Sequence, residues 1–508
     1  MVMLGLDAAE HSVIESLIAR GRMPTLGRLR QLGTHGLLRS PADLYSGAVW
    51  PTFYSGQRVP WHGVYHNKLW QPGRMCCTVP DARTYRARPF WESPGDADIR
   101  TCIVDVPLIL GNARPSNGVY LSGWATHDLT ATCSSPASLW RALQREFGRR
   151  TMPVENFGPQ NTRSLERLLG ELLRATEQLQ RVSLSLLRRE RWDFTCIVFG
   201  AAHRAGHYLW DLEQAHEADR ADAKQRARLA KAVECVYEAI DGALGELLPQ
   251  VGADARVIVF SLHGMGPNGG WSEIVPEMLD TWRRSLSQQA VRRGVLYALR
   301  NALGGTARPL RRLIPASLAA QLVPLWSSRM FEWSRTSVFP LPMDLTGLLR
   351  VNLRLRERDG IVSPGRDYEA LCGQLEEFFS SLRDCATGRP IVSSIVRAYE
   401  QAPHAAPYRD GQPDLIVRWT ELRTSEVPAL LSSQLPRYRC PVPRWLPSGR
   451  SGNHLPTGWF VAAGPGIAAK ASLATHDILD LAPTARALLG LQPDPSLHGS
   501  PLPLGSAQ

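Results

Sequence analysis

Lysine is almost missing from this chain, although the chain is basic. Only four of its 58 basic residues are lysines, so arginine supplies nearly all of the formal net charge of +11. The sequence also lacks the dense basic runs with interleaved aromatics that are typical of nucleic-acid-binding proteins. We therefore expect no nucleic-acid partner, whereas a basic surface favours small anionic substrates or membrane surfaces through long-range attraction.

Long apolar runs and paired cysteine motifs are absent as well. No stretch approaches the roughly 18 apolar residues of a membrane-spanning helix. The first residues, MVMLGLDAAE, lack the basic and then apolar pattern of a signal peptide. The nine cysteines show no CxxC spacing, and several lie in apolar runs, which favours reduced, buried thiols. Together these absences predict a soluble, cytoplasmic protein without a transmembrane segment.

Short apolar runs rich in Val, Ile and Leu alternate with helical patterns along the chain. Runs that polar or Gly residues end after a few positions are typical of buried parallel strands. Strands alternating with helices predict an α/β protein whose mostly parallel central sheet has helices on both faces. The runs lie at residues 2–7, 101–107, 194–200, 256–264, 413–419 and 458–466.

Residues 272–345 interrupt this alternation. The segment is Arg-rich and amphipathic, with Pro and Gly between its apolar stretches. It predicts a helical insertion or cap, and the main domain then comprises residues 1–271 and 346–508. A membrane-surface segment or a protein-interaction surface is the alternative interpretation.

Polar side chains follow several of the predicted strands where each strand ends. In open α/β sheets, ligands bind at the carboxyl ends of the strands, and imidazole with carboxylate suits zinc or a similar metal. A single histidine after a strand is more often a hydrogen-bonded loop residue, so this pattern alone leaves both interpretations open. The residues are Asp7, His203, His207, His263 and, just before the last strand, His454.

A more specific pattern lies in residues 46–67, SGAVWPTFYSGQRVPWHGVYHN. It resembles the type I phosphodiesterase/nucleotide pyrophosphatase branch of the alkaline phosphatase superfamily. In that branch, a Thr or Ser nucleophile precedes a Ser-Gly or Thr-Gly pair, and His-Gly follows at a fixed spacing. Here Ser46, Ser55-Gly56 and His62-Gly63 keep those spacings, and Asn67 falls where relatives carry a phosphate-contacting Asn.

Other motifs extend the resemblance from residue 2 to about residue 503. The opening LGLDAAEH places Asp7 as a metal ligand, and FSLHGMG is similar to the Ser-Asp-His-Gly-Met segment of the family. The loop SGNHLPTGWF carries the last ligand, His454. The resemblance implies an alkaline-phosphatase-like fold and one or two divalent metals, most often zinc, with Mn or Fe as alternatives.

The same resemblance implies roles for particular residues. Ser46 would be a metal-activated nucleophile that forms a phosphoseryl intermediate. One metal would be held by His203, His207 and His454, and Asp7 and His263 would serve a second metal beside Ser46. His203 and Leu262 stand where relatives carry Asp. If two metals still bind, the site should prefer highly anionic substrates; if the second is missing, a metal hydroxide would attack directly.

These observations predict a metal-dependent hydrolase of phosphate mono- or diesters. Arg204 and His127 are candidate substrate-binding residues; the alternatives are a side chain pointing to solvent for Arg204 and loop hydrogen bonding for His127. The alternatives for the function are a phosphoryl transferase, a sulfate or phosphonate ester hydrolase, and a catalytically degenerate protein that only binds a ligand. The substrate's organic group and the oligomeric state stay open.

Overall fold

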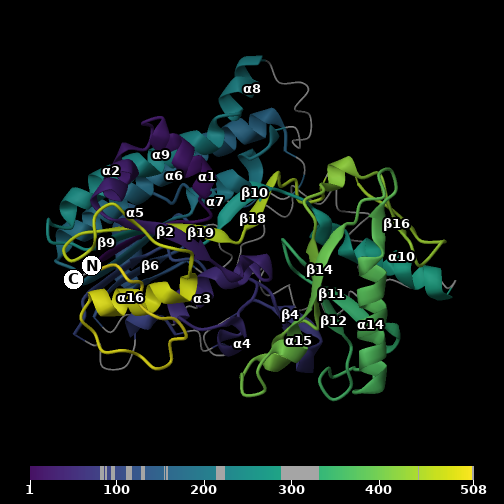
Figure 1. Ribbon diagram of the computed structural model, residues 1–508. Coiled ribbons are helices and arrows are strands. Elements are labelled where there is room, and N and C mark those ends of the chain that lie inside the picture. The colour runs from purple at the N-terminus through teal and green to yellow at the C-terminus, as the bar shows by residue number, and fades with distance from the viewer. Residues whose placement is uncertain are drawn as a thin grey trace.

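One large sheet forms the centre of the molecule (Figure 1). The computed structural model describes residues 1–80, 85, 88–92, 98–109, 117–126, 132–153, 155, 158, 160–212, 223–287, 331–443 and 446–505. The ten-stranded sheet has the order β20 (Ala471–Ser472), β2 (Thr34–Arg39), β19 (Thr457–Ala463), β9 (Val257–Ser261), β1 (Val2–Leu6), β8 (Phe194–Phe199), β5 (Thr101–Val104), β6 (Gly118–Ser122) and β7 (Cys133–Ser135), with β21 (His476–Asp477) beside β2.

The middle of this sheet is parallel, as the sequence predicts. Strands β9, β1, β8, β5 and β6 run in one direction. Strand β19 corresponds to the last apolar run, but it lies antiparallel to both β9 and β2. The start of β19 therefore lies at the same edge of the sheet as the end of β9.

Side chains on alternate positions of the strands enter two separate hydrophobic cores. Along β1, Val2, Leu4 and Leu6 belong to one core and Met3 to the other, as the period of two in a strand requires. The first core is covered by α1 (His11–Ala19), α2 (Pro24–Leu32), α5 (Ala137–Phe147), α6 (Thr162–Arg189), α7 (Ala201–Leu209) and α9 (Ala232–Leu247). On the other face lie α3 (Val49–Ser55), α4 (Val59–His62) and α16 (Leu481–Leu488) (Figure 1). The predicted helices on both faces are confirmed.

A second lobe stands beside this sheet (Figure 1). It has its own hydrophobic core, which runs from Trp271 to Cys440 in sequence. Among its described residues, the helices are α10 (Val275–Ser287), α14 (Arg366–Ser380) and α15 (Ala398–Gln401). An antiparallel sheet of order β11 (Val338–Leu341), β12 (Gly347–Val351), β15 (Leu415–Trp419) and β14 (Val392–Arg397) and a smaller one of order β13 (Leu382–Asp384), β16 (Ala429–Ser432) and β17 (Arg439–Pro441) complete it. We call this lobe the cap.

The predicted insertion at 272–345 contributes only part of the cap. Of that range, residues 272–287 and 331–345 are described, and they include helix α10 and strand β11. Strand β11 pairs with β12, which lies beyond the predicted boundary. The cap core continues to Cys440 because apolar residues that follow residue 345 pack against α10. The described cap is therefore a mixed α+β unit that extends further along the chain than the predicted helical segment.

Shorter elements connect the two lobes. Strands β3 (Leu69–Gln71) and β4 (Cys76–Thr78) form a small hairpin, and β10 (Gly264–Pro267) pairs with β18 (Gly452–Leu455). The exposed helix α8 is Ala223–Leu229.

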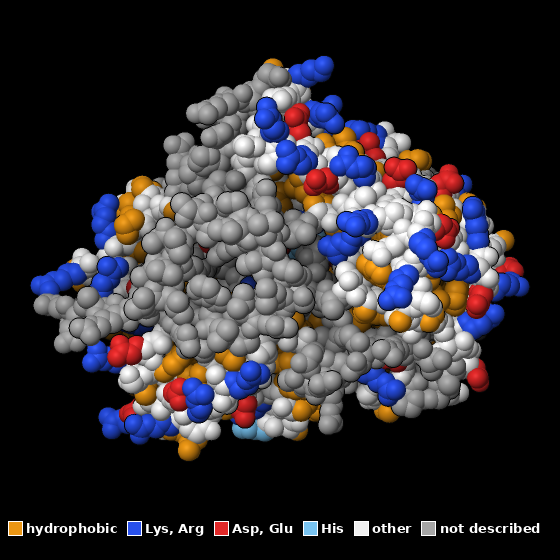
Figure 2. All heavy atoms as spheres, turned by 180° about the vertical axis from the view of Figure 1, so that it is seen from behind, with side chains coloured by type: hydrophobic (Ala, Val, Ile, Leu, Met, Phe, Trp, Pro, Cys, Tyr) orange, Lys and Arg blue, Asp and Glu red, His pale blue; other side chains and the backbone are white. Residues whose placement is uncertain are grey.

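None of the helices within the described ranges is long and apolar enough to cross a bilayer. On the face in Figure 2, the coloured Lys and Arg side chains are interspersed with Asp and Glu rather than gathered in one patch.

A buried ion-pair network holds the cap together. The Asp414 carboxylate has a fully buried side chain and accepts hydrogen bonds from Arg356 at 2.7 Å and from the Tyr368 hydroxyl at 2.8 Å. Arg356 and Arg350 hold the pKa of Asp414 below its ordinary value, although burial acts in the opposite direction. Removing this carboxylate would leave two buried cations, Arg350 and Arg356, to share the single carboxylate of Glu357, which is more costly than losing a surface ion pair.

Asp414→Ala is therefore expected to lower the free energy of unfolding by about 3–5 kcal/mol. Chemical denaturation followed by tryptophan fluorescence would measure the change. Asp359→Ala is the matched control, because Asp359 pairs with Arg358 on an exposed surface and its loss should change stability little. Equal, small effects of the two substitutions would show that the buried network does not stabilise the fold.

Candidate active site

The predicted site residues come together at one edge of the central sheet. Asp7 follows β1, His203 and His207 lie on α7 directly after β8, and His263 follows β9. His454 lies on β18, immediately before the antiparallel strand β19, and this orientation brings it to the same edge. All five side chains are buried.

Helix α7 presents His203 and His207 on one side because residues four apart share a helix face. The ring centres of the two histidines are 4.6 Å apart. His203 Nδ1 lies 2.8 Å from a carboxylate oxygen of Asp7, and His207 Nδ1 lies 2.9 Å from the carbonyl oxygen of Gly452. Because both partners are acceptors, each Nδ1 carries the proton and each Nε2 keeps its lone pair.

The electrostatic environment keeps these imidazoles neutral. Burial lowers the pKa of His203 far below its ordinary value, and the nearby His263 and Arg450 lower it further. Burial, Arg450 and the neighbouring histidines have the same effect on the pKa of His207. Neutral imidazole is the form that binds a metal ion.

Four imidazoles pack against one another at this edge. The ring centre of His454 lies 4.9 Å from that of His203, 4.8 Å from that of His207 and 4.6 Å from that of His263. One ligand atom each from His203, His263 and His454 lies within 4.8 Å of the other two. The motif resemblance implied His207, rather than His263, as the third ligand beside His203 and His454. The converging set therefore differs from the predicted set by one residue.

The donor set fits a transition-metal ion. Three convergent imidazole nitrogens are the protein ligands of many catalytic zinc sites, which keep a fourth position open. His207 Nε2 is buried and makes no hydrogen bond to any residue of the described ranges. A polar atom in that position lacks compensation for its lost hydration unless a further ligand binds there. His203, His263 and His454 are therefore the candidate ligands of one ion, with His207 beside them.

Asp7 acts on this set through His203. One of its oxygens accepts the His203 Nδ1 proton, and the other accepts a hydrogen bond from Trp50 Nε1 at 2.7 Å. A carboxylate in this position fixes the ring and makes the opposite nitrogen a better donor. Leu262, where relatives carry Asp, is fully buried in the second hydrophobic core. Within the described part of the chain, no convergent donor set includes Asp7.

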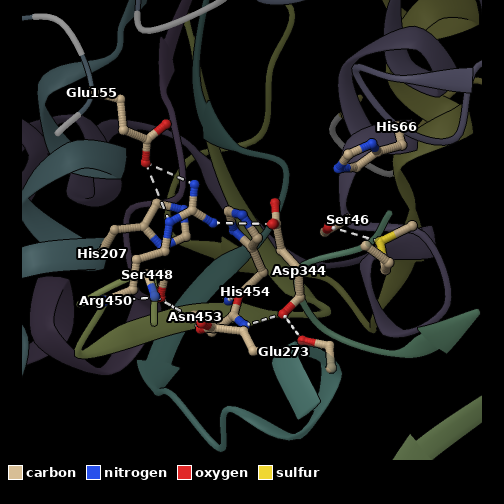
Figure 3. Close-up of polar contacts among 12 residues, drawn as sticks. Ser46, His66, Glu155, His207, Glu273, Asp344, Ser448, Arg450, Asn453 and His454 are labelled. Carbon is tan, nitrogen blue, oxygen red and sulfur yellow. Dashed lines mark hydrogen bonds and ion pairs between the residues drawn. The ribbon is translucent and has the colours of Figure 1, made fainter. Parts of the chain in front are cut away.

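Ser46 opens the short 3₁₀ turn Ser46–Ala48 that leads into α3. Its hydroxyl donates a hydrogen bond to the Met343 sulfur of the cap at 3.3 Å. At Gly47 a Cβ atom would lie 2.6 Å from the Cα of His66, so only glycine fits this close approach of the two backbones. Figure 3 shows Ser46 between Asp344 on one side and His66 on the other.

His66 lies on the other side of Ser46 from His454 and Asp344 (Figure 3), and Asn67 follows it in the chain. Burial lowers the pKa of His66 to about 4, so its ring is neutral near pH 7. The Asn67 side-chain oxygen is buried and has no hydrogen-bond partner in the described ranges. Asn67 was predicted from its motif position, whereas no motif pointed to His66.

A chain of charged residues borders the histidine cluster, and most of it was not predicted. Arg450 donates to Glu155 at 2.7 Å and pairs with Asp344 of the cap at 3.3 Å (Figure 3). Arg204 is buried, and its guanidinium lies 3.5 Å from Glu155. Arg204 therefore neutralises a carboxylate rather than projecting into solvent. The other predicted substrate-binding residue, His127, lies outside the described residues.

Two of these residues, Asp344 and Arg450, lie in sequence patterns that could have identified them. Asp344 follows the apolar run VFPLPM, just as the other site residues follow strands, but it lies in the segment interpreted as a helical insertion. Arg450 lies four residues before His454 in the loop SGRSGNHL. Inspecting strand ends within the insertion would have identified the first of them.

Comparisons with known proteins show which family and which solved structures this chain is similar to. The family model described as type I phosphodiesterase / nucleotide pyrophosphatase matches residues 1–309. Phosphonoacetate hydrolase from Sinorhizobium meliloti 1021, solved with phosphonoacetate and with phosphonoformate, is similar at TM-scores of 0.53 and 0.52, with 15% identity over 96% of this chain and 95% of that chain. Human ectonucleotide pyrophosphatase / phosphodiesterase 5 gives a TM-score of 0.48 at 12% identity over 98% and 97% of the two chains. No curated protein matches the sequence.

Proposed function

The chain belongs to the type I phosphodiesterase / nucleotide pyrophosphatase family, and we propose that it cleaves phosphate mono- or diesters with Ser46 as nucleophile. As a member of this family, in the alkaline phosphatase superfamily, it is a phosphoric ester hydrolase. Enzymes of the family depend in general on divalent metal ions. The observation that supports the proposal best is the convergence of the buried His203, His263 and His454 on one point.

The metal would be held by His203, His263 and His454, with zinc as the expected ion because three imidazoles favour it. When bound, it would act as a Lewis acid that neutralises charge on the phosphoryl oxygens. Asp7 keeps the proton of His203 on Nδ1, and the Gly452 carbonyl does the same for His207. This arrangement supports one ion directly, since Leu262 gives no ligand where the second ion of relatives would bind.

Ser46 supplies the nucleophilic oxygen in this proposal. The hydroxyl proton passes to water, and Oγ forms a bond to phosphorus while the bond from phosphorus to the ester oxygen breaks. The departing oxygen takes up a proton and leaves as the alcohol, and water later hydrolyses the phosphoserine, which restores the Ser46 hydroxyl. Before attack, the Ser46 hydroxyl must give up its hydrogen bond to the Met343 sulfur. Gly47, next to Ser46, packs against the backbone of His66, which precedes Asn67. The Asn67 amide nitrogen is the proposed donor to a phosphoryl oxygen in this arrangement.

Removing the metal tests the proposal. Dialysis against a chelator should abolish hydrolysis of p-nitrophenyl phosphate and bis-p-nitrophenyl phosphate, and added Zn²⁺ or Mn²⁺ should restore it. Metal content per chain, measured by mass spectrometry before and after dialysis, is the matching readout. Undiminished hydrolysis by a metal-free protein would contradict metal dependence. Absence of hydrolysis at full metal occupancy, together with retained phosphate binding, would identify a protein that only binds its ligand.

A further inference from the structure

Asp344 brings a carboxylate from the cap to the candidate active site. Its backbone carbonyl accepts hydrogen bonds from the Ser272 hydroxyl at 2.6 Å and from the Asn453 amide at 2.7 Å. The preceding residue, Met343, contacts the Ser46 hydroxyl. The main chain at Asp344 is therefore fixed on both sides, next to the nucleophile and next to the strand that carries His454.

The Asp344 side chain lies among cationic and titratable groups. Its carboxylate is 3.3 Å from Arg450, and the side chain is still 40% exposed. In Figure 3 the carboxylate lies between Ser46 and His66 on one side and His454 and Arg450 on the other. Although desolvation acts in the opposite direction, the Arg450 guanidinium holds the pKa of Asp344 below its ordinary value. The carboxylate is thus ionised at neutral pH.

The positive charge of Arg450 is already balanced before a substrate binds. Glu155 accepts its hydrogen bonds at 2.7 and 3.2 Å, and Arg204 lies 3.5 Å from the second oxygen of Glu155. Two arginines and two carboxylates thus form a group without net charge. The exposed member of this group is Asp344, so the side turned toward Ser46 presents a negative charge to a bound phosphoryl group.

We infer that Asp344 determines the charge of the substrate, selecting phosphodiesters with one ionised oxygen over phosphomonoesters with two. This inference rests on the proposed function of the site. A like charge held close to a bound anion costs binding free energy, more so where water is partly excluded. A diester phosphoryl group can turn its esterified oxygen toward Asp344, whereas a monoester dianion has no uncharged ester oxygen to spare besides its leaving group.

This selection is opposite to the sequence-based expectation for a site with two metals. Replacement of two Asp residues by His203 and Leu262 suggested a strongly cationic site that prefers highly anionic substrates. The structure adds a carboxylate from a distant part of the chain, Asp344, that offsets part of that charge. The substrate class favoured by this geometry is a phosphodiester, or a phosphate ester whose organic group places a hydrogen-bond donor or a cation near Asp344.

The test compares two substrates in the metal-loaded enzyme. We expect Asp344→Asn to raise kcat/KM for p-nitrophenyl phosphate relative to that for bis-p-nitrophenyl phosphate by about 10-fold or more. Asp344→Ser, also neutral, should shift the ratio in the same direction, and Asp344→Glu, which keeps the charge, should shift it much less. The backbone bonds to Ser272 and Asn453 do not involve the side chain, so these variants should fold.

Asp211→Asn is the matched control. Asp211 pairs with Arg423 of the cap at 3.0 Å, so this substitution also removes one carboxylate from the junction between the two lobes. Its substrate ratio should stay within about twofold of the wild-type ratio. An unchanged ratio in both neutral Asp344 variants, with wild-type hydrolysis intact, would overturn the inference while leaving the proposed function standing. A wild-type enzyme that is metal-loaded and cleaves neither substrate would instead refute the proposed function.

Discussion

Ser46→Ala is expected to lower kcat for bis-p-nitrophenyl phosphate by about 10³-fold or more, without loss of bound metal. Ser46 provides the oxygen that attacks phosphorus, and alanine offers no substitute for it. The metal should stay because no histidine donor atom depends on the Ser46 hydroxyl, whose hydrogen bond goes to Met343. Steady-state kinetics and metal analysis on the same preparation would measure both effects.

Two further measurements make this expectation specific. Ser185→Ala is the control, because the Ser185 hydroxyl donates to Glu146 and accepts from Arg189 on the exposed side of α6, so its loss should leave kcat unchanged. Rapid acid quenching of the wild-type reaction, followed by peptide mass spectrometry, should detect phosphate on Ser46. Full activity in Ser46→Ala would reject the covalent route and favour attack by a metal-activated water.

Replacing His454 by Ala is expected to remove the metal and to lower kcat/KM by more than about 100-fold. His454 is the central member of the cluster, with ring contacts to His203, His207 and His263. Its loss leaves two donors of the converging set, which hold a divalent ion far more weakly than three. Metal content after gel filtration and hydrolysis at several zinc concentrations would measure the two effects.

His476→Ala provides the comparison for this variant. His476 lies on β21, is partly exposed and pairs with Asp480 at 3.5 Å, so its removal should change neither metal content nor activity. Normal zinc binding and activity in His454→Ala would show that the ion is held elsewhere. Partial recovery at high zinc concentration would agree with the expectation, because weakened binding is compensated by mass action.

The sheet and the residues at its edge follow from local features of the sequence. Buried parallel strands need continuous apolar runs, and the polar residue that ends each run, such as Asp7 after β1, is forced to the same edge. His203 and His207 could be placed on one helix face from their spacing alone. For these residues, the local pattern determines the position, since neighbouring parallel strands end together.

Other parts depend on contacts between distant segments, which local patterns do not contain. The antiparallel direction of β19 decides that His454 reaches the cluster, and nothing within its apolar run indicates direction. The pairing of Arg450 with Glu155, 295 residues earlier, likewise becomes visible only in three dimensions. The converging set contains His263 in place of the predicted His207. Which of these two histidines belongs to the set depends on the exact positions of α7 and of the end of β9, and motif spacing does not resolve such positions.

The contacts of Asn453 limit which caps can be combined with this catalytic domain. Its amide nitrogen bonds the Asp344 carbonyl of the cap at 2.7 Å, while its amide oxygen accepts the backbone N–H of His454 at 2.9 Å. One side chain thus joins the cap to a candidate metal ligand. The cap is consequently not an exchangeable module, and a chimera that imports a foreign cap must also import a compatible partner for residue 453 to keep the metal ligand in place.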